Sequence, residues 1–106
     1  MNYRYMRTIV LFDLPMETKP EQKQYRKFIK FLKKSGFIMF QKSVYTKLHI
    51  NNSTLDNQKR LINKNLPSNG IVSILNITEK QFQTIEHLIG QRSSNIIDDD
   101  SRYVEL

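Results

Sequence analysis

Apolar side chains follow a strand-like pattern in three parts of the chain. Residues 6–12 form a nearly continuous run of β-branched, aromatic and other apolar side chains, which is typical of a central strand covered on both faces. This run stops at Asp13, two residues before Pro15, which cannot continue a strand. Residues 37–50 are strand-like with a polar interruption, "QKS", and therefore predict two short strands. Residues 71–77 predict a further strand rich in β-branched side chains.

A helical pattern separates the first of these strands from the second. Thr18 and Glu21 have the spacing of a capping box, so Thr18 is the expected N-cap, and Gly36 is a typical helix stop. Apolar side chains recur at i, i+3, i+4 and i+7 and predict one buried stripe, made of Tyr25, Phe28, Ile29 and Leu32. The remainder of this helix carries basic side chains.

Two further helices are predicted. The second has Ser53 as N-cap and ends at Pro67. Its expected inward side chains are Leu55, Ile62 and Leu66. The third begins after Thr78 and is stopped by Gly90. Its expected apolar side chains are Phe82, Ile85, Leu88 and Ile89.

The order of elements over residues 5–77 is β-α-β-β-α-β, which predicts an α+β fold of the ferredoxin-like type. We expect a ferredoxin-like domain over residues 1–78, followed by a C-terminal helix and tail over residues 79–106 that contacts a second protomer or a partner protein. The last residues, "SRYVEL", can add an edge strand to a neighbouring sheet. A sheet of this type carries helices on one face only, so apolar side chains on both strand faces favour a homodimer.

Length and composition restrict the class of protein. The 106 residues suffice for one compact domain, and the absence of cysteine leaves no disulfide or thiolate metal site. The longest apolar runs fall far short of the roughly 20 residues that cross a bilayer, so we expect a cytoplasmic protein without a membrane partner.

Charge is distributed unevenly along the chain. Residues 1–77 hold fourteen basic and four acidic side chains, whereas residues 78–106 hold three basic and six acidic ones. A basic body of this kind fits a polyanionic partner, although it also fits a surface that merely keeps the protein in solution. Lysines dominate it, which suits sequence-independent contact with phosphates. The candidate nucleic-acid-binding residues are Arg4, Arg7, Lys23, Arg26, Lys27, Lys30, Lys33, Lys34 and Lys42.

Asp13 is the best candidate for chemistry because a carboxylate at the end of a buried strand is rigidly mounted. Its alternative role is to cap the turn that follows. Mg²⁺ is held by one or two carboxylates with waters and substrate phosphates, and no second ligand set accompanies Asp13 in the sequence. In a symmetric dimer, Asp13 could meet its symmetry mate around a cation.

Three segments carry a resemblance to a known family. They are "VLFDLPMET" at residues 10–18, "YRKFIKFLKKSGFIMFQKSVYTK" at residues 25–47, and "GIVSILNITEKQF" at residues 70–82. In content and order they closely resemble the CRISPR-associated protein two family, the small subunit of the spacer-acquisition complex, in its type II form. The resemblance spans nearly the full chain.

This resemblance implies a ferredoxin-like homodimer that bridges dimers of the CRISPR integrase and holds double-stranded DNA through its phosphates. It also implies that Asp13 is the strand-end aspartate assigned to Mg²⁺ binding. Some relatives are metal-dependent nucleases that act on single-stranded RNA or double-stranded DNA. Several relatives carry an arginine two residues before the conserved glutamine, whereas here Met39 and Phe40 precede Gln41. This departure argues against cleavage and leaves duplex scaffolding untouched.

Three functions therefore compete. The first is a non-catalytic DNA-binding scaffold in spacer acquisition, and the second is a Mg²⁺-dependent endonuclease that uses Asp13. The third is an RNA-recognition module that stacks bases on aromatic side chains, for which "KSGFIMFQ" supplies Phe37 and Phe40 without the required alternation.

Overall fold

The computed structural model describes residues 5–90, so the predictions for Arg4 and for residues 91–106, including the added edge strand, lie outside the described residues. The strands form one four-stranded sheet in the order β2-β3-β1-β4, and every neighbouring pair is antiparallel. The strands are β1 (Met6–Asp13), β2 (Ile38–Gln41), β3 (Val44–His49) and β4 (Ile71–Thr78).

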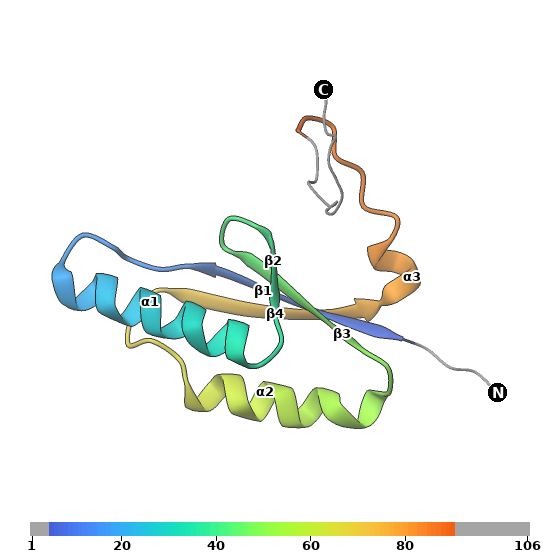
Figure 1. The fold of residues 1–106 in the computed structure, drawn as a ribbon, viewed down its shortest axis with the longest axis horizontal. Helices are drawn as coiled ribbons and strands as arrows, with labels where there is room; N and C mark the ends of the chain where they lie inside the picture. Colours follow the sequence, from blue (N-terminus) through green and yellow to red (C-terminus); the bar gives the residue numbers. More distant parts are fainter. Residues whose placement is uncertain (1–4, 91–106) are drawn as a thin grey trace.

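The helices follow the predicted order along the chain. They are α1 (Lys19–Lys34), the 3-10 turn η1 (Asn52–Thr54), α2 (Leu55–Lys64) and α3 (Glu79–Phe82). Figure 1 shows α1 and α2 next to each other on one side of the strands. The α+β class and the β-α-β-β-α-β order with a ferredoxin-like strand arrangement are therefore confirmed.

Local sequence determines both ends of α1. The hydroxyl of Thr18 accepts a hydrogen bond from the Glu21 N–H at 3.3 Å, and the Glu21 carboxylate accepts one from the Thr18 N–H at 3.0 Å, which is the predicted capping box. After the helix, Gly36 has a φ of 95°, a conformation that favours glycine.

The two faces of the sheet differ in what covers them. On β1, Val10 and Phe12 point toward α1 and are buried in the hydrophobic core with Phe28 and Leu32 of that helix. The alternate positions of β1, among them Leu11 and Asp13, point to the opposite side. We call this side, away from α1 and α2, the open face.

The second helix begins differently from the prediction. Ser53 is not its N-cap: Thr54 precedes α2 without a side-chain capping bond, and Asn51 instead caps the 3-10 turn η1, where its side chain accepts a hydrogen bond from the Ser53 N–H at 3.0 Å. The Asn51 side chain thus forms a local turn that starts a 3-10 helix, and α2 follows from Leu55. Leu66 was expected to point inward but lies beyond the end of α2 and is 45% exposed.

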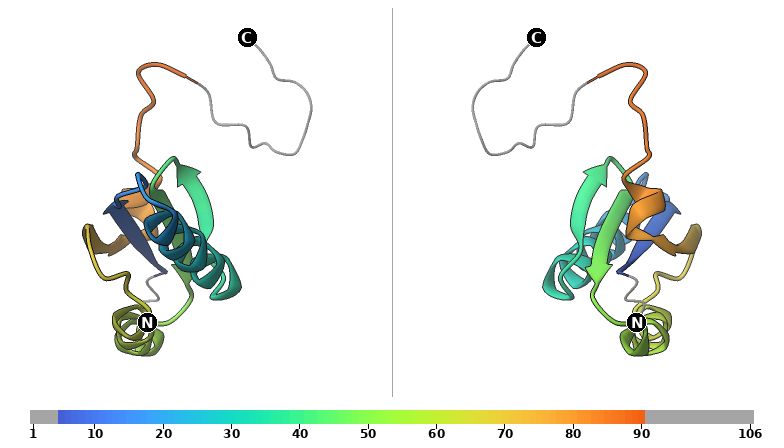
Figure 2. Two further views of the ribbon diagram at one scale, coloured as in Figure 1. Left: turned by 90° about the vertical axis from the view of Figure 1, so that its left-hand side faces the viewer. Right: turned by 90° about the vertical axis from the view of Figure 1, so that its right-hand side faces the viewer.

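The third helix is much shorter than predicted. Thr78 caps it through a capping box with Gln81, as expected, but the helix ends at Phe82. Leu88 and Ile89 are almost fully exposed, so no buried surface supports further turns. Figure 1 and Figure 2 show the segment after α3, as far as residue 90, running away from the sheet. The proposed domain boundary at residue 78 stays a prediction.

Candidate functional site

The solvent side of α1 carries a row of basic side chains that we call the cationic face. All of its members are exposed: Lys23, Arg26, Lys27, Lys30, Lys33 and Lys34. Within residues 5–90 the structure shows a single ion pair, between Arg7 and Glu79, so the cationic face has no carboxylate partner there. Its unneutralised charge can attract a polyanion, and that attraction falls with added salt.

Lys42 lies apart from α1, in the tight turn between β2 and β3. Its side chain is exposed, and the next residue, Ser43, has a φ of 65°. The Ser43 carbonyl accepts a hydrogen bond from the Phe12 N–H at 3.1 Å. The turn therefore lies at the end of the sheet where β1 ends, next to Asp13.

Arg7 is also separate from the cationic face, because it lies on the open face under α3. Its guanidinium forms a bidentate pair with Glu79, with Nε–Oε1 and Nη2–Oε2 distances of 2.7 Å. The same group lies 4.3 Å from the centre of the Phe82 ring, which is the geometry of a cation–π contact. The prediction that Arg7 contacts phosphate stays untested, but its donors are already engaged inside the protomer.

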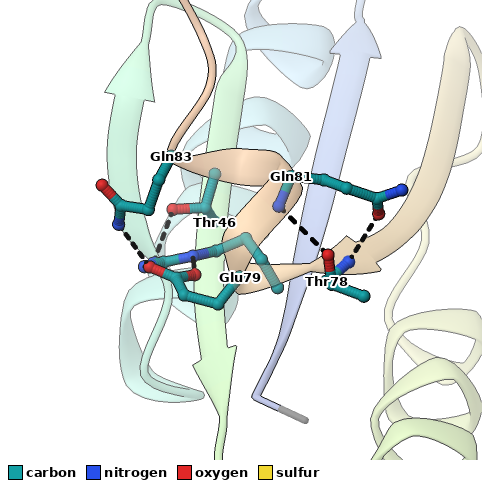
Figure 3. A network of polar contacts seen from close by, with 6 residues as sticks. Thr46, Thr78, Glu79, Gln81 and Gln83 are labelled. Carbon is teal, nitrogen blue, oxygen red and sulfur yellow. Dashed lines mark hydrogen bonds and ion pairs between the residues drawn. The ribbon is translucent and has the colours of Figure 1, made fainter.

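Neighbouring polar groups hold this pair in place. Figure 3 shows Gln83 and Glu79 close together, and the Gln83 amide donates to the Glu79 carboxylate at 2.6 Å. The hydrogen bond from Arg7 is the main cause that lowers the pKa of Glu79 below its ordinary value. Arg7 and Glu79 are therefore both charged, and their ion pair holds α3 against the sheet.

Asp13 ends β1, the strand end that the sequence predicted for it. Its side chain lies on the open face and is exposed. In the register of the sheet it is paired with Ile71 of β4. The backbone at this end is closely packed, because a Cβ built on Gly70 would lie 2.7 Å from the Asp13 carbonyl oxygen. Gly70 has a φ of 100°, so both its conformation and its surroundings demand glycine.

The described part of the chain does not assemble a metal-binding cluster around Asp13. No group of three His, Cys, Asp or Glu side chains comes together within residues 5–90. Asp13 offers one carboxylate, and Mg²⁺ held there would take its other ligands from waters, substrate phosphates or a second protomer.

The open face also displays apolar side chains along the sheet, from Ile71 beside Asp13 to Leu48 beside Arg7. Its exposed apolar members come from all four strands: Leu11, Ile38, Leu48, Ile71 and Leu75. Exposed apolar patches of this kind mark interaction surfaces. Asp13 and this patch are therefore parts of one surface, on the side of the sheet opposite the core.

Aromatic side chains do not form a base-stacking platform on this surface. Phe37 is 3% exposed and belongs to the hydrophobic core. Phe40 contacts the rings of Phe82 and His87, with ring centres 5.2 Å and 5.6 Å away. The two central strands, β1 and β3, have no aromatic side chain on the open face within the described residues.

The sequence reasoning missed one polar cluster under α2, which surrounds Lys47. The Lys47 ammonium donates to the Ser35 carbonyl at 2.7 Å and to the Gln58 side chain at 2.8 Å. Burial lowers the pKa of Lys47. Strand alternation could have indicated this placement, because Lys47 has the same parity as the buried Tyr45.

These features define a small α+β protein with a cationic helix face and an apolar open sheet face. The family model described as CRISPR associated protein Cas2 matches residues 6–85, and the chain belongs to this family. A protein named CRISPR-associated endoribonuclease Cas2 from Streptococcus mutans is 46% identical over 101 residues, covering 95% of this chain and 93% of that protein.

Other relatives carry the same name. One from Treponema denticola is 46% identical over 101 residues, covering 95% of this chain and all (100%) of the relative. One from Ligilactobacillus salivarius is 40% identical over 101 residues, with the same 95% and 100% coverage. The resemblance stated from the sequence is therefore confirmed at the level of the family. No helix within residues 5–90 is long and apolar enough to cross a membrane.

Proposed function

We propose that this protein is a spacer-acquisition subunit that holds double-stranded DNA on its cationic face and serves as a scaffold for the CRISPR integrase. The observation that carries this proposal is the cationic face of α1, six exposed basic side chains without a carboxylate partner in residues 5–90. Exposed lysines contact phosphates without reading bases, so the duplex is bound regardless of sequence. The protein acts in the cytoplasm, where its DNA partner is found.

The same proposal includes a homodimer formed through the open face. A symmetric interface buries the same patch from both protomers, so both copies of Leu11 and of Leu75 would be removed from water in one dimer. Each protomer then presents its cationic face away from the interface, because α1 lies on the opposite side of the sheet. A dimer can therefore bridge two integrase assemblies along one duplex.

Salt-dependent binding of a labelled duplex tests the scaffold function. Replacing Lys23 and Lys30 together by Gln should weaken binding and lower the slope of log K against log salt by up to about 1.8, or about 0.9 per lost phosphate contact. The matched control, Lys59→Gln with Lys80→Gln, removes the same charge from α2 and α3. Equal loss in both variants would mean that only net charge matters.

Assembly provides the second test. The protein, its integrase and a duplex should form a ternary complex at low salt, and the Lys23/Lys30 variant should form less of it. A wild-type protein that binds neither duplex nor integrase would contradict the scaffold function.

A second candidate function is Mg²⁺-dependent cleavage of RNA or double-stranded DNA. It is favoured by the name endoribonuclease that the relatives carry and by the exposed Asp13 carboxylate on the open face. In a dimer, one Asp13 from each protomer would hold the cation, which would supply charge neutralisation for the scissile phosphate. Asp13 itself would position that cation.

Cleavage of single-stranded RNA and duplex DNA by wild type and Asp13→Asn decides between the two functions. If Asp13 is the site, the variant should lose activity with both Mg²⁺ and Mn²⁺ while still binding duplex. Equal cleavage by both proteins would exclude Asp13, and no cleavage by wild type would leave the scaffold function alone.

A further inference from the structure

A cleft of about 280 Å³ lies between the first half of α1 and the end of α2. Gln24, Lys27 and Phe28 of α1 form one wall. The other wall comes from Lys64 and the residues that follow it, Asn65, Leu66, Pro67 and Ser68. The cleft therefore joins the cationic face of α1, through Lys27, to a second basic side chain from a different helix.

The side chains that line this cleft suit an anion. Its lining includes two lysines and no carboxylate. The one acidic residue of α1, Glu21, already accepts hydrogen bonds from the N–H groups of Glu17 and Thr18, both at 3.0 Å. Lys27 and Lys64 are both exposed, so their ammonium groups can turn toward a bound group.

Polar contacts fix the wall opposite α1. The Gln24 side-chain oxygen accepts hydrogen bonds from the Ser68 N–H at 2.8 Å and from the Ser68 hydroxyl at 3.1 Å. Because the oxygen of Gln24 is occupied in this way, its amide nitrogen is the end left to donate to a ligand. The bond also ties the loop after α2 to α1, so the width of the cleft is set before any ligand binds.

The C-terminal end of a helix normally repels anions, but at the C-terminal end of α2 some of the carbonyl groups are satisfied by hydrogen bonds. The Asn65 N–H donates to the Ile62 carbonyl, and the Asn65 side chain donates to the Leu61 carbonyl, both at 2.9 Å. These bonds reduce the exposed negative end of α2 that an anion would meet. Lys64 adds a full positive charge at the same place.

We infer that this cleft binds a phosphate of the duplex backbone, so that the DNA crosses from α1 onto the end of α2 rather than lying along α1 alone. This inference rests on the proposed duplex binding and adds Lys64 and Gln24 to it as specific contacts, with Ser68 holding the Gln24 side chain in position. The ligand is a backbone phosphodiester, because charge and hydrogen-bond donors, rather than a base-shaped pocket, make up the site.

Duplex binding over a range of salt tests the inference with a matched pair of lysines on α2. Lys64→Gln should weaken binding about fivefold, the size of one exposed ion pair, and lower the salt slope by up to about 0.9. Lys59→Gln removes the same charge from the same helix outside the cleft, and it should change the slope much less. Ser68→Asp places a carboxylate in the cleft and should weaken binding more than Lys64→Gln.

A double variant separates a shared phosphate from two independent contacts. If Lys27 and Lys64 hold the same phosphate, Lys27→Gln and Lys64→Gln together should cost less than the product of their separate losses. Equal behaviour of Lys64→Gln and Lys59→Gln, with the Lys23/Lys30 variant still weakened, would overturn the cleft but keep the duplex-binding function. Failure of the wild-type protein to bind duplex would overturn both the cleft and the duplex-binding function.

Discussion

Arg7 of β1 and Glu79 of α3 are 72 positions apart in the chain and form a bidentate ion pair with both N–O distances at 2.7 Å. Their side chains are 15% and 18% exposed, so the pair is largely removed from water. Together with Phe82 over the guanidinium, it attaches α3 to the open face. A helix of four residues has little stability of its own, so this attachment must come from tertiary contacts.

Breaking the pair should therefore destabilise the protein measurably. Glu79→Gln leaves the Arg7 charge without its partner, and we expect the free energy of unfolding to fall by about 2 kcal/mol. Arg7→Met combined with Glu79→Gln should cost less than the sum of the two single changes, because the double variant leaves no unpaired charge. Chemical denaturation measures these values, and Lys80→Gln is the exposed control. Additive losses would show that the two side chains do not interact in solution.

Gly70 is predicted to tolerate no side chain. Gly70→Ala forces a left-handed φ of 100° on alanine and places its Cβ 2.7 Å from the Asp13 carbonyl oxygen. We expect a loss of about 2–4 kcal/mol, from backbone strain of about 1–2 kcal/mol and the displacement of the end of β1. Gly90→Ala is the control, because Gly90 has a φ of 86° but nothing within 4 Å of an added Cβ.

This comparison isolates the close approach of two chain segments. Gly90→Ala should cost no more than the backbone strain, and thermal unfolding measures the difference between the two variants. If the two substitutions cost the same, the packing between Gly70 and Asp13 contributes nothing. Duplex binding should survive in Gly70→Ala where the protein remains folded, since the cationic face lies elsewhere.

The sequence predicted best the features that depend on neighbours along the chain. Thr18 and Glu21 are three residues apart, and their capping box follows from spacing alone. The strands and the buried stripe of α1 follow from periodicity in the same way. The candidate Asp13 was placed at an exposed strand end, as its position before Pro15 indicated.

Contacts between segments distant in the chain could not be predicted from spacing or periodicity. Arg7 was predicted to contact phosphate, since its ion-pair partner, Glu79, lies far along the chain and no local spacing indicates the pair. The place of Lys64 across a cleft from Lys27 depends on how α1 and α2 pack. The early end of α3 also depends on tertiary structure, because Leu88 and Ile89 find no surface to cover.

His49 should make stability depend on pH in a defined window. Its Nδ1 lies 2.8 Å from the Thr54 hydroxyl, and the ring is buried beneath η1. Burial is the main cause that lowers the pKa of His49 below 6.5, and the charges of Lys47 and Arg7 add to it. The folded protein therefore prefers neutral His49, whereas the unfolded chain takes up a proton near pH 6.5.

The sign of the effect follows directly. Between the two pKa values the unfolded chain binds more protons, so the stability contribution is complete above pH 6.5 and decreases as the pH falls below it. The slope should approach about 1.4 kcal/mol per pH unit for one proton. His49→Asn keeps an amide donor for Thr54 and does not titrate. Denaturation of this variant between pH 5 and pH 7 should therefore show a free energy of unfolding without the slope that one His49 proton contributes. An unchanged slope in the variant would assign the effect to another group.

The open face should be the surface on which two copies of the chain meet. Leu75 of β4 is 50% exposed there, whereas Leu66 after α2 is 45% exposed on the helix side. A carboxylate at position 75 would be buried opposite its symmetry mate in a homodimer, where desolvation and like-charge repulsion both oppose association. Leu75→Glu should therefore weaken the dimer at least about tenfold, and light scattering after size exclusion should show monomer at micromolar concentration.

Leu66→Glu adds the same charge at a similarly exposed leucine and should leave the dimer intact. Dissociation by Leu66→Glu alone would place the interface on the helix side, where it would compete with the duplex for α1.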